Sequence, residues 1–549
     1  MLSRLYTVAR PRPSLLLHVR RAHSTPSYRP STRVKPLRIG ILASGFLGGA
    51  YYLNTTTIEA DADLEEIASD PLRHSPFSTL LRSYTVYALC SIPFVVEYSP
   101  ALLSKLITIP GISTITEAIV RSTFFPQFVG GESAEETLPL LSQMRRDHKG
   151  VLFAYSVEVD EAQVDGKAVE ILDAGTEIHR LNVAETIKCI DVAGDFEDKV
   201  ASQSGRKTWV AIKLTALLPS AQALVNFSHH LIQTRPKTSP SIRFPGCPHP
   251  SDLAFIESGA PAPSSLTPEE VADLKQLYED LTRIVERGRQ RGVQIIVDAE
   301  YSWYQPAIDA FTLSLTRRFN ALPKNNSKSD SLNNVQPLIY ATYQAYLRRT
   351  PEHLRQSFKD AQAGGYSLGI KLVRGAYHHF EVQADPSLEG CPVWMTKPET
   401  DECYDACAAV IISALQQDIQ RKEKIPRVGV LFGTHNSNSC MKILDGLVKE
   451  GIANKEGKKV VISPAAAERC TIGQLYGMSD ALTDKLVGQV VSPSPFVIKY
   501  VPYGPLVAVM PYLGRRAIEN KSVLSGEGGA AAERKRVGAE IRRRLLFLA

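Results

Sequence analysis

The sequence predicts an α/β fold: a (βα)8 TIM-like barrel with an N-terminal helical region and surface insertions. From Val151 onward, short runs of β-branched and aromatic residues alternate with longer stretches of helical pattern. Such alternation is typical of parallel βα units, and eight units favour a closed barrel over an open sheet. The composition, 44% hydrophobic with a mean hydropathy of −0.10, is that of a globular protein.

Eight short runs carry the strand pattern, and stretches of helical pattern separate them. In chain order the predicted strands are Val151–Val157, Trp209–Leu214, Val293–Val297, Leu338–Thr342, Leu368–Val373, Val428–Phe432, Thr471–Leu475 and Phe496–Val501. The seventh run has the weakest strand pattern of the eight. Together the runs place a barrel domain at residues 151–525.

Two segments rich in Pro, Ser or Asn interrupt the alternation. Gln233–Glu269 is dense in Pro and Ser, and Pro323–Asn334 contains a run of Asn, Ser and Lys. Such composition is typical of surface loops, so we expect both insertions to be mobile. Ahead of the barrel, residues 60–148 are rich in Leu, Ser and Ala and are expected to form helices.

Both ends of the chain differ from its body. Residues 1–38 are Arg-rich and free of acids, which is typical of a mitochondrial transit peptide, the alternative being a disordered basic arm. Residues 39–58 carry no charge and are either a weak membrane contact or part of the leader. The tail, 526–549, is predicted to be a basic amphipathic helix that touches a membrane surface, a partner or the domain itself.

Composition also argues against several classes of function. The first 58 residues hold nine Lys or Arg and no acid, so the remainder carries a net charge of −3 and offers no basic body for nucleic acid. The eight cysteines form no CxxC pair and no set with zinc spacing, so we expect reduced thiols and no metal. No G-x-G-x-x-G follows a predicted strand, which argues against a Rossmann nicotinamide site.

Polar residues lie at the C-terminal ends of the predicted strands, which meet at one face of a barrel. They include Lys213, Asp298, Gln344, Lys371 and His435. Because a buried charge costs several kcal/mol unless it is paired or used, we expect Lys213 to pair with Asp298 and the set to form a site. Taken singly, each has a structural alternative, such as a surface lysine or a hydrogen-bonded core histidine.

A second polar feature follows the last predicted strand. If 512–520 is helical, Tyr512, Arg515, Arg516 and Glu519 fall at i, i+3, i+4 and i+7, on one face. Two adjacent guanidiniums form a planar receptor for a small carboxylate, and Glu519 either holds one of them or pairs with a substrate amine. The alternative is a solvated face whose Arg–Glu pair contributes only about 0.3 kcal/mol.

Ordered motifs in the chain resemble the proline dehydrogenase family in its mitochondrial eukaryotic form. They are Lys371–Tyr377 (KLVRGAY), Gly433–Asn436 (GTHN), Gln474–Met478 (QLYGM), and Lys499–Gly504 (KYVPYG) with Tyr512–Asn520. The resemblance covers about Val151 to Asn520. It implies a distorted (βα)8 barrel that carries FAD on its C-terminal face. It also implies oxidation of L-proline to Δ1-pyrroline-5-carboxylate, with electrons passed to ubiquinone at the matrix side of the mitochondrial inner membrane.

The resemblance further implies which residues bind the cofactor. Lys371 is expected near the flavin N5, where it counts as catalytic, and Gln344 is expected to bond the flavin ring. Arg374, Gly375 and Ala376 are expected to line the cofactor. Thr434, His435 and Asn436 are expected at the ribityl–phosphate region, and Lys397 near the adenine-side phosphates.

For the substrate, the resemblance implies that Arg515, Arg516 and Lys213 bind the proline carboxylate. Asp298 would hold Lys213, and Glu519 would orient an arginine. Leu475, Tyr500 and Tyr512 would form an apolar wall over the pyrrolidine ring. Relatives that oxidise hydroxyproline tend to carry a smaller residue than Tyr500, so a tyrosine favours proline.

Two other functions remain compatible with the residues alone. A Schiff-base aldolase barrel would use Lys213 or Lys371 as its nucleophile. A membrane-associated scaffold without catalysis would use the basic tail and leave the polar strand ends as structural pairs.

Overall fold

The computed structural model describes residues 71–92, 109, 111–156, 178–200, 205–323, 336–385, 390–523 and 529–546. The chain divides into two units, Met1–Ser69 and Asp70–Ala549, and all described residues belong to the second. The predicted transit peptide, the uncharged segment 39–58 and most of the insertion Pro323–Asn334 lie outside the described residues.

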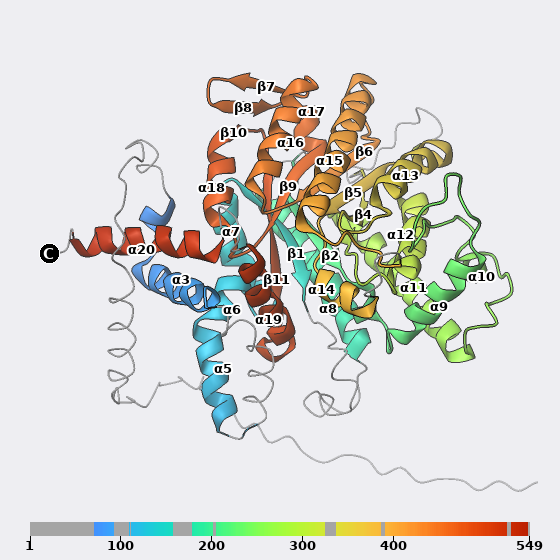
Figure 1. Ribbon diagram of the computed structural model, residues 1–549, viewed down its shortest axis with the longest axis horizontal. Coiled ribbons are helices and arrows are strands. Elements are labelled where there is room, and N and C mark those ends of the chain that lie inside the picture. The colour runs from blue at the N-terminus through green and yellow to red at the C-terminus, as the bar shows by residue number, and fades with distance from the viewer. Residues whose placement is uncertain are drawn as a thin grey trace, which may run out of the picture. The chain divides into compact units, whose positions relative to one another are not determined.

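Parallel strands close into an eight-stranded barrel (Figure 1). They are β1 (Lys149–Tyr155), β2 (Thr208–Ile212), β3 (Ile295–Val297), β4 (Ile339–Gln344), β5 (Leu368–Val373), β6 (Val428–Gly433), β9 (Cys470–Leu475) and β11 (Val497–Tyr503). The ring closes where β1 pairs with β11, in the register Leu152↔Tyr500. The predicted barrel is therefore confirmed, and the weak seventh run is a barrel strand.

Helices follow the strands and cover the outside of the barrel (Figure 1). They are α8 (Ile178–Val200), α9 (Gln222–Thr234), α11 (Pro268–Arg291), α12 (Gln305–Phe319), α13 (Thr350–Gly364), α14 (His378–Ala384), α15 (Lys397–Gln420), α16 (Ser437–Lys449), α18 (Asp480–Gln489) and α19 (Leu506–Val523). Two of the longest, α11 and α15, begin with capping boxes made by Thr267 with Glu270 and by Thr396 with Glu399. These caps satisfy amide groups that a helix start leaves without partners.

A small sheet outside the barrel was not predicted. It joins β7 (Ala453–Glu456), β8 (Lys459–Ile462) and β10 (Val490–Val491), and α17 (Pro464–Arg469) follows β8. The turn between β7 and β8 contains Gly457 with φ +60°, which favours glycine. After its first residue β7 is exposed and polar, so its sequence lacks the apolar alternation that predicts a strand.

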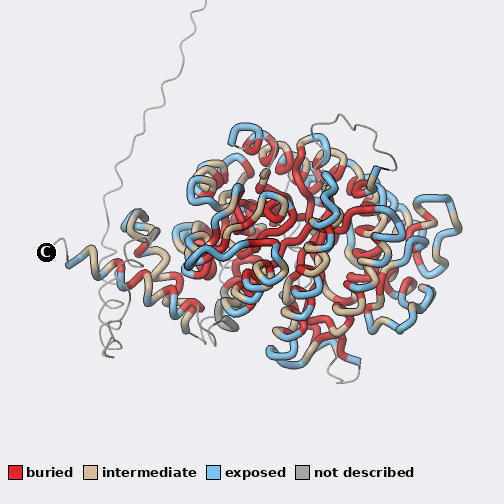
Figure 2. Tube along the Cα trace, turned by 90° about the horizontal axis from the view of Figure 1, so that it is seen from above, coloured by how far each residue is buried: buried red, intermediate tan, exposed pale blue. Residues whose placement is uncertain are grey.

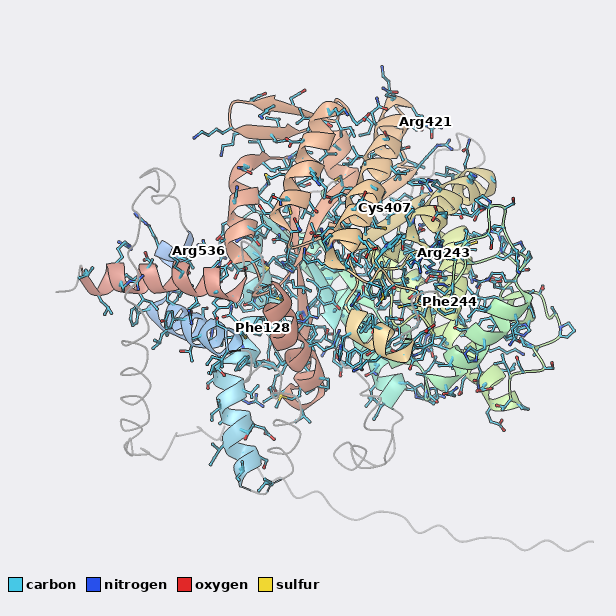
Figure 3. The ribbon with its side chains drawn as sticks, viewed as in Figure 1. Phe128, Arg243, Phe244, Cys407, Arg421 and Arg536 are labelled. Carbon is cyan, nitrogen blue, oxygen red and sulfur yellow. The ribbon has the colours of Figure 1, made fainter. Side chains whose placement is uncertain are left out.

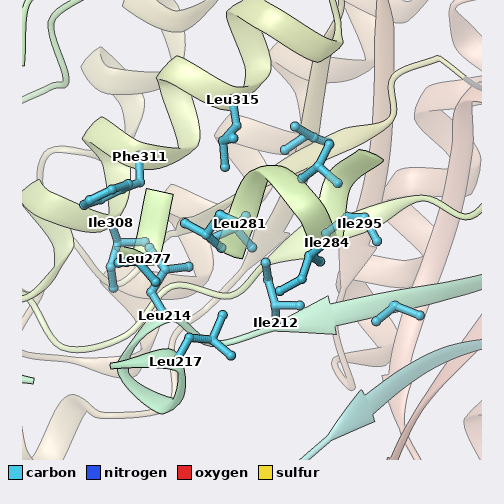
Figure 4. Close-up of a cluster of buried hydrophobic side chains, with 14 of the residues drawn as sticks. Ile212, Leu214, Leu217, Leu277, Leu281, Ile284, Ile295, Ile308, Phe311 and Leu315 are labelled. Atoms are coloured by element: carbon cyan, nitrogen blue, oxygen red, sulfur yellow. The ribbon is translucent and has the colours of Figure 1, made fainter. Parts of the chain in front are cut away.

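Apolar side chains pack on both sides of the barrel wall. Inside, one cluster consists of Leu152, Ala154, Trp209, Ala211, Ile296, Tyr340, Leu431 and Ile498. Outside, Ile212 and Ile295 of the strands belong to the same cluster as Leu281 and Ile284 of α11 (Figure 4). Buried residues run along the strands and the inner sides of the helices (Figure 2). Because side chains fill the barrel, a ligand site has to form at one of its ends.

Part of the insertion Gln233–Glu269 packs against the barrel helices, and its expected mobility stays a prediction. Arg235 and Asp252 form a 2.7 Å ion pair with both side chains nearly fully buried. Arg349, at the start of α13, donates a 2.6 Å hydrogen bond to the carbonyl of Gly246. The short helix α10 (Ala254–Glu257) lies within the same segment. Composition did not reveal this arrangement, because the pair joins residues that only the fold brings together.

Helices also precede the barrel in the chain. They are α3 (Phe77–Cys90), α5 (Ile112–Ser122), α6 (Phe124–Phe128) and α7 (Leu138–Arg146), with the short 3-10 helices η1 (Pro71–His74) and η2 (Glu135–Thr137). None of the helices in the described part of the chain is both long and apolar enough to cross a membrane.

The C-terminal helix α20 (Ala530–Leu546) packs along α3 (Figure 1). Ala530 and Val537 are buried in one cluster with Leu80 and Tyr87 of α3. Near the end of the helix, Arg544 donates to the carbonyl of Ser75 at 2.8 Å. Among the contacts expected for the basic tail, the structure shows docking on the domain itself.

The capping box of α11 yields a stability prediction. We expect Thr267→Ala to lower the free energy of unfolding by about 1 kcal/mol, because the amide of Glu270 loses its acceptor. Thr267→Ser keeps the hydroxyl and should stay close to the parent. Chemical denaturation measures both, and equal losses in the two variants would contradict the role of the hydroxyl.

Candidate active site

A buried ion pair crosses the C-terminal mouth of the barrel. Lys371 of β5 places its Nζ 2.5 Å from Oδ1 of Asp298, which directly follows β3. Tyr500 of β11 donates to Oδ2 of the same carboxylate at 3.2 Å, and the Lys371 ammonium lies 5.2 Å from the Tyr500 ring centroid. Both charged side chains are only 11% exposed. The carboxylate therefore links the end of β3 to β5, two places away around the ring, and to β11, three places away.

Lys213 lies at the same mouth, directly after β2 and before the 3-10 helix η5 (Leu214–Leu217). Its charge acts on Glu300, two residues beyond Asp298. Burial raises the pKa of Glu300, while Lys213 and two hydrogen bonds from Thr215 oppose that rise. The sequence missed the Lys371 partner of Asp298, and the pairing of Asp298 with Lys213 stays a prediction.

Gln344, the last residue of β4, has a fixed amide orientation. Its Nε2 donates to the carbonyl of Glu300 at 3.1 Å and to the hydroxyl of Tyr346 at 3.2 Å. Both amide hydrogens are therefore used. The Oε1 atom is buried and has no hydrogen-bond partner among the described residues. A ligand that satisfies this atom has to present an N–H or O–H donor.

Arg374 connects three elements around the end of β5. Its guanidinium donates to Asp401 of α15 at 2.6 Å, to Thr434 after β6 at 2.8 Å and to Ser439 of α16 at 2.8 Å. These bonds fix the guanidinium beside the end of β5, and the expected role of Arg374 in lining the cofactor stays a prediction. The backbone that follows can still approach a ligand.

Glycine is required immediately after Arg374. Gly375 has φ +124°, and a Cβ there would lie 2.6 Å from the ring of Tyr346. Ala376, next in the chain, is exposed. Lys397, the first residue of α15, is 61% exposed and pairs with Asp401 at 2.6 Å. It therefore shares the carboxylate that Arg374 also uses.

The loop after β6 contains a histidine whose tautomer follows from its contacts. His435 Nε2 accepts from the backbone N–H of Leu475 at 3.1 Å. Burial, with the charges of Lys499, Arg516 and Arg374, lowers the pKa of His435 to about 3. The ring is therefore neutral near pH 7, and its proton is on Nδ1, a buried atom without a partner in the described part of the chain.

The neighbours of His435 hold the loop in place. Thr434 accepts from Arg374 and also from the backbone N–H of Asn436 at 3.0 Å. Asn436 caps α16 by accepting from the N–H of Ser439 at 3.0 Å. These bonds use Thr434 Oγ1 and Asn436 Oδ1 as acceptors, and the contact of both residues with the ribityl–phosphate region stays a prediction.

Helix α19 includes the whole predicted segment 512–520. Arg516 is 4% exposed, and its guanidinium lies 4.8 Å from the ring centroid of Tyr512, one turn earlier. The guanidinium of Arg515 lies 5.6 Å from the ring centroid of Tyr377, two residues beyond Gly375. The side chain of Glu519 lies outside the described residues, so its role as an orienting partner stays a prediction.

The structure adds an aromatic group that sequence reasoning missed. Tyr301 stacks on Trp303 with centroids 4.4 Å apart and meets Tyr377 at 4.3 Å. Because Arg515 faces the same Tyr377 ring, this group lies beside the proposed carboxylate receptor. The sequence signal was the position of Tyr301 and Trp303 directly after Asp298 and Glu300, at the end of a strand.

The donors and acceptors at the mouth fit an isoalloxazine ring. That ring carries an N–H donor and carbonyl acceptors on one edge. Gln344 Oε1 supplies an acceptor, and His435 Nδ1–H supplies a donor, both buried and unmatched in the described chain. Lys371 supplies the cation that would favour a reduced, anionic flavin. Among the described residues, no group of His, Cys, Asp or Glu is placed to hold a metal ion.

Comparison with known proteins identifies the family of this chain. A family model described as proline dehydrogenase matches residues 149–526, which include the entire barrel. The chain belongs to the proline dehydrogenase family.

Individual relatives in this family share slightly less than a third of their residues with this chain. Proline dehydrogenase 2, mitochondrial, of Arabidopsis thaliana is 29% identical over 498 residues, covering 89% of this chain and 92% of that protein. Hydroxyproline dehydrogenase of Rattus norvegicus is 30% identical over 474 residues, covering 85% and 91%. The names of the relatives therefore include both proline and hydroxyproline.

Among solved structures, proline utilization A from Bdellovibrio bacteriovorus, inactivated by N-propargylglycine, matches with a TM-score of 0.52 and 18% identity. The match covers 88% of this chain and 41% of that protein, so this chain spans about two fifths of its length. At this identity the match supports the barrel fold alone.

The ion pair at the mouth yields a second prediction. Asp298→Ala removes the counter-charge of buried Lys371 and should lower the free energy of unfolding by about 3 kcal/mol. Tyr500→Phe removes only a neutral donor to the same carboxylate and should cost about 1 kcal/mol. Chemical denaturation compares the two variants, and a larger loss for Tyr500→Phe would contradict the dominance of the ion pair.

Proposed function

We propose that this chain oxidises L-proline to Δ1-pyrroline-5-carboxylate, using FAD as hydride acceptor at N5 and ubiquinone as the final electron acceptor. This reaction is the first step of proline catabolism to glutamate. The observation that carries the proposal is the Arg515–Arg516 pair on α19, which directly follows the last barrel strand. The membership of the chain in the proline dehydrogenase family supports it.

The substrate would be held through its carboxylate. Arg515, Arg516 and Lys213 supply the cations, and adjacent guanidiniums bind a carboxylate with defined geometry. Tyr500, Leu475 and Tyr512 would cover the ring. The Tyr500 hydroxyl is held by Asp298, so its ring has a fixed position at the mouth. Fixing the ring carbon against the acceptor removes orientational entropy from the barrier.

The cofactor would be held by residues from several strand ends. Lys371, Gln344 and His435 offer a cation, an acceptor and a donor to the ring. The backbone at Gly375, Ala376, Thr434 and Asn436 would line it, with Lys397 toward the adenine-side phosphates. Hydride acceptance and passage of two electrons to a quinone are the chemistry that FAD supplies when bound. No described residue is assigned as base, so the substrate amine would lose its proton to solvent before binding.

The location that fits this chemistry is the matrix side of the mitochondrial inner membrane. The Arg-rich, acid-free residues 1–38 support import by a transit peptide. The relative from Arabidopsis thaliana carries the word mitochondrial in its name. In the proposed domain order, the uncharged segment 39–58 and the helical region 60–148 precede the barrel at 151–525. The basic tail, 526–549, follows it.

The Schiff-base alternative finds no support in the geometry of Lys371. A lysine nucleophile has to be a neutral amine, whereas Lys371 is bonded to a carboxylate at 2.5 Å. Hydroxyproline oxidation is the second candidate, because the relative from Rattus norvegicus carries that name. Tyr500 argues against it, since its large side chain leaves less room beside the ring.

Anaerobic titration tests the proposed reaction. Purified protein with FAD should be yellow and should bleach when L-proline is added, with trans-4-hydroxy-L-proline much less effective. Protein that cannot be loaded with FAD, or that keeps its colour in the presence of proline, would contradict the proposal.

The ring of Tyr500 should set the choice between the two substrates. Tyr500→Ser should raise the ratio of kcat/KM for hydroxyproline to that for proline by about tenfold, because space opens for the hydroxyl. Tyr500→Phe keeps the bulk and should leave the ratio near the parent value. A shift of the same size in both variants would assign selectivity to the Asp298 hydrogen bond instead.

The carboxylate receptor has its own test. Arg515→Met should raise KM for L-proline by about 10- to 100-fold through loss of a charged contact. Arg421→Met is a matched control, because Arg421 is exposed at the end of α15, away from α19 (Figure 3). Steady-state kinetics would contradict the assignment if both variants kept the parent KM.

A further inference from the structure

The loop between β9 and α18, residues 476–479, contains two residues with positive φ and passes close to the backbone of α6. Gly477 has φ +71°, and a Cβ there would lie 1.9 Å from the backbone oxygen of Gln127. Ser479 has φ +50°, a left-handed conformation that non-glycine residues rarely adopt. The loop begins directly after Leu475, a proposed wall residue. Such a conformation persists only where neighbouring elements hold it.

Helices from before the barrel supply part of that support. Tyr87 of α3 is buried and donates its hydroxyl to the carbonyl of Gly477 at 3.1 Å. Gln127 of α6 donates to the same hydroxyl at 3.0 Å. Phe128, labelled in Figure 3, is buried in one cluster with Tyr87 and Met478. The loop therefore rests on residues far from it in the chain.

The C-terminal helix supplies the other part. Ser479, at the N-cap of α18, makes no side-chain cap. Glu533 of α20 takes that role and accepts from the backbone N–H of Ala481 at 2.8 Å. Arg536, one turn later in α20, pairs with Asp484 of α18 at 2.8 Å. Helix α18 is thus capped by a residue from another helix.

The strand that carries Tyr500 is joined to the same loop. Lys499 is 2% exposed and donates to the carbonyl of Met478 at 2.9 Å, to Asp480 at 3.1 Å and to Thr483 at 3.0 Å. Leu475, at the other side of the loop, donates its N–H to His435. Displacement of the loop would therefore move Leu475 and Tyr500 of the proposed substrate wall. It would also move His435, which is proposed to bind the cofactor.

We propose that α3 and α20, both outside the family match at 149–526, hold the loop 476–479 and so position Leu475 and Tyr500 for substrate. We call the two contacts that hold it, from Tyr87 to Gly477 and from Glu533 to Ala481, the clasp. Glu533 is the positioning residue of this clasp. It touches neither substrate nor cofactor and acts through the first turn of α18. The proposal rests on the proposed oxidation of proline for its kinetic consequence, but not for its structural one.

The test compares three variants of the full-length, FAD-loaded protein. Glu533→Ala removes the cap, and Glu533→Gln keeps an acceptor oxygen. Burial and the Asp480 charge raise the pKa of Glu533, which favours a neutral group at this position. Lys535→Ala, an exposed residue on the same helix, is the matched control.

Hydrogen–deuterium exchange reports on the loop without any substrate. Amides of residues 475–485 should exchange at least about fivefold faster in Glu533→Ala than in the parent. Glu533→Gln and Lys535→Ala should match the parent. Unchanged exchange in Glu533→Ala, or equal acceleration in Glu533→Gln, would overturn the clasp.

Kinetics report on the positioning of the wall. Glu533→Ala should raise KM for L-proline by about fivefold and leave kcat within about twofold, with rescue in Glu533→Gln. Faster exchange with an unchanged KM would reduce Glu533 to a purely structural residue and overturn the positioning role. If Glu533→Ala shows the expected faster exchange but the parent protein does not oxidise L-proline, the proposed function is refuted and the structural role of Glu533 stands.

Should Glu533→Ala fail to fold, Tyr87→Phe tests the same clasp from α3. It removes a single hydroxyl that binds Gly477 and keeps the buried ring. The same direction of change in exchange and KM is expected. Parent values in both measurements would overturn the proposal.

Discussion

Parallel pairing of β1 with β11 joins the first and last strands of the barrel and closes the ring. Every other feature of the site depends on this closure. It leaves no sheet edge in the barrel, it fills the interior with side chains such as Trp209 and Tyr340, and it confines ligand binding to an end. It also places Tyr500 of β11 within hydrogen-bonding distance of Asp298 after β3, three places away around the ring.

The closed barrel buries several lysines, and each has hydrogen-bond acceptors within reach. Lys371 has Asp298, and Lys499 has Asp480 with two further acceptors. At the other end of the barrel, buried Lys207 donates to the carbonyl of Ala467 at 2.7 Å, and burial lowers its pKa to about 8. Buried charges of this kind are stable only when partners compensate for lost hydration. The same pairing holds Lys371 rigidly at the mouth, where a flavin could use its charge.

Much of the candidate site could be predicted from sequence because strand ends in a barrel converge. That rule places Lys213, Asp298, Gln344, Lys371 and His435 at one face without any knowledge of contacts. It does not say which side chains meet. The bond between Lys371 and Asp298, the three bonds of Arg374 and the tautomer of His435 depend on ångström-scale placement of different strands. The aromatic group around Tyr301 was missed for the same reason.

By itself the sequence determined the fold class and indicated the end of the barrel where the candidate site lies, because hydrophobic periodicity and strand order are local properties of the chain. Only the tertiary structure decided the partners. The Arg235–Asp252 pair packs an insertion that composition alone marks as a loop. For the basic tail, composition left a membrane surface, a partner and the domain itself as alternatives, and the structure shows it docked on the domain, where Glu533 caps α18. Such contacts join residues distant in the chain, and their energy depends on burial and geometry that only the closed barrel provides.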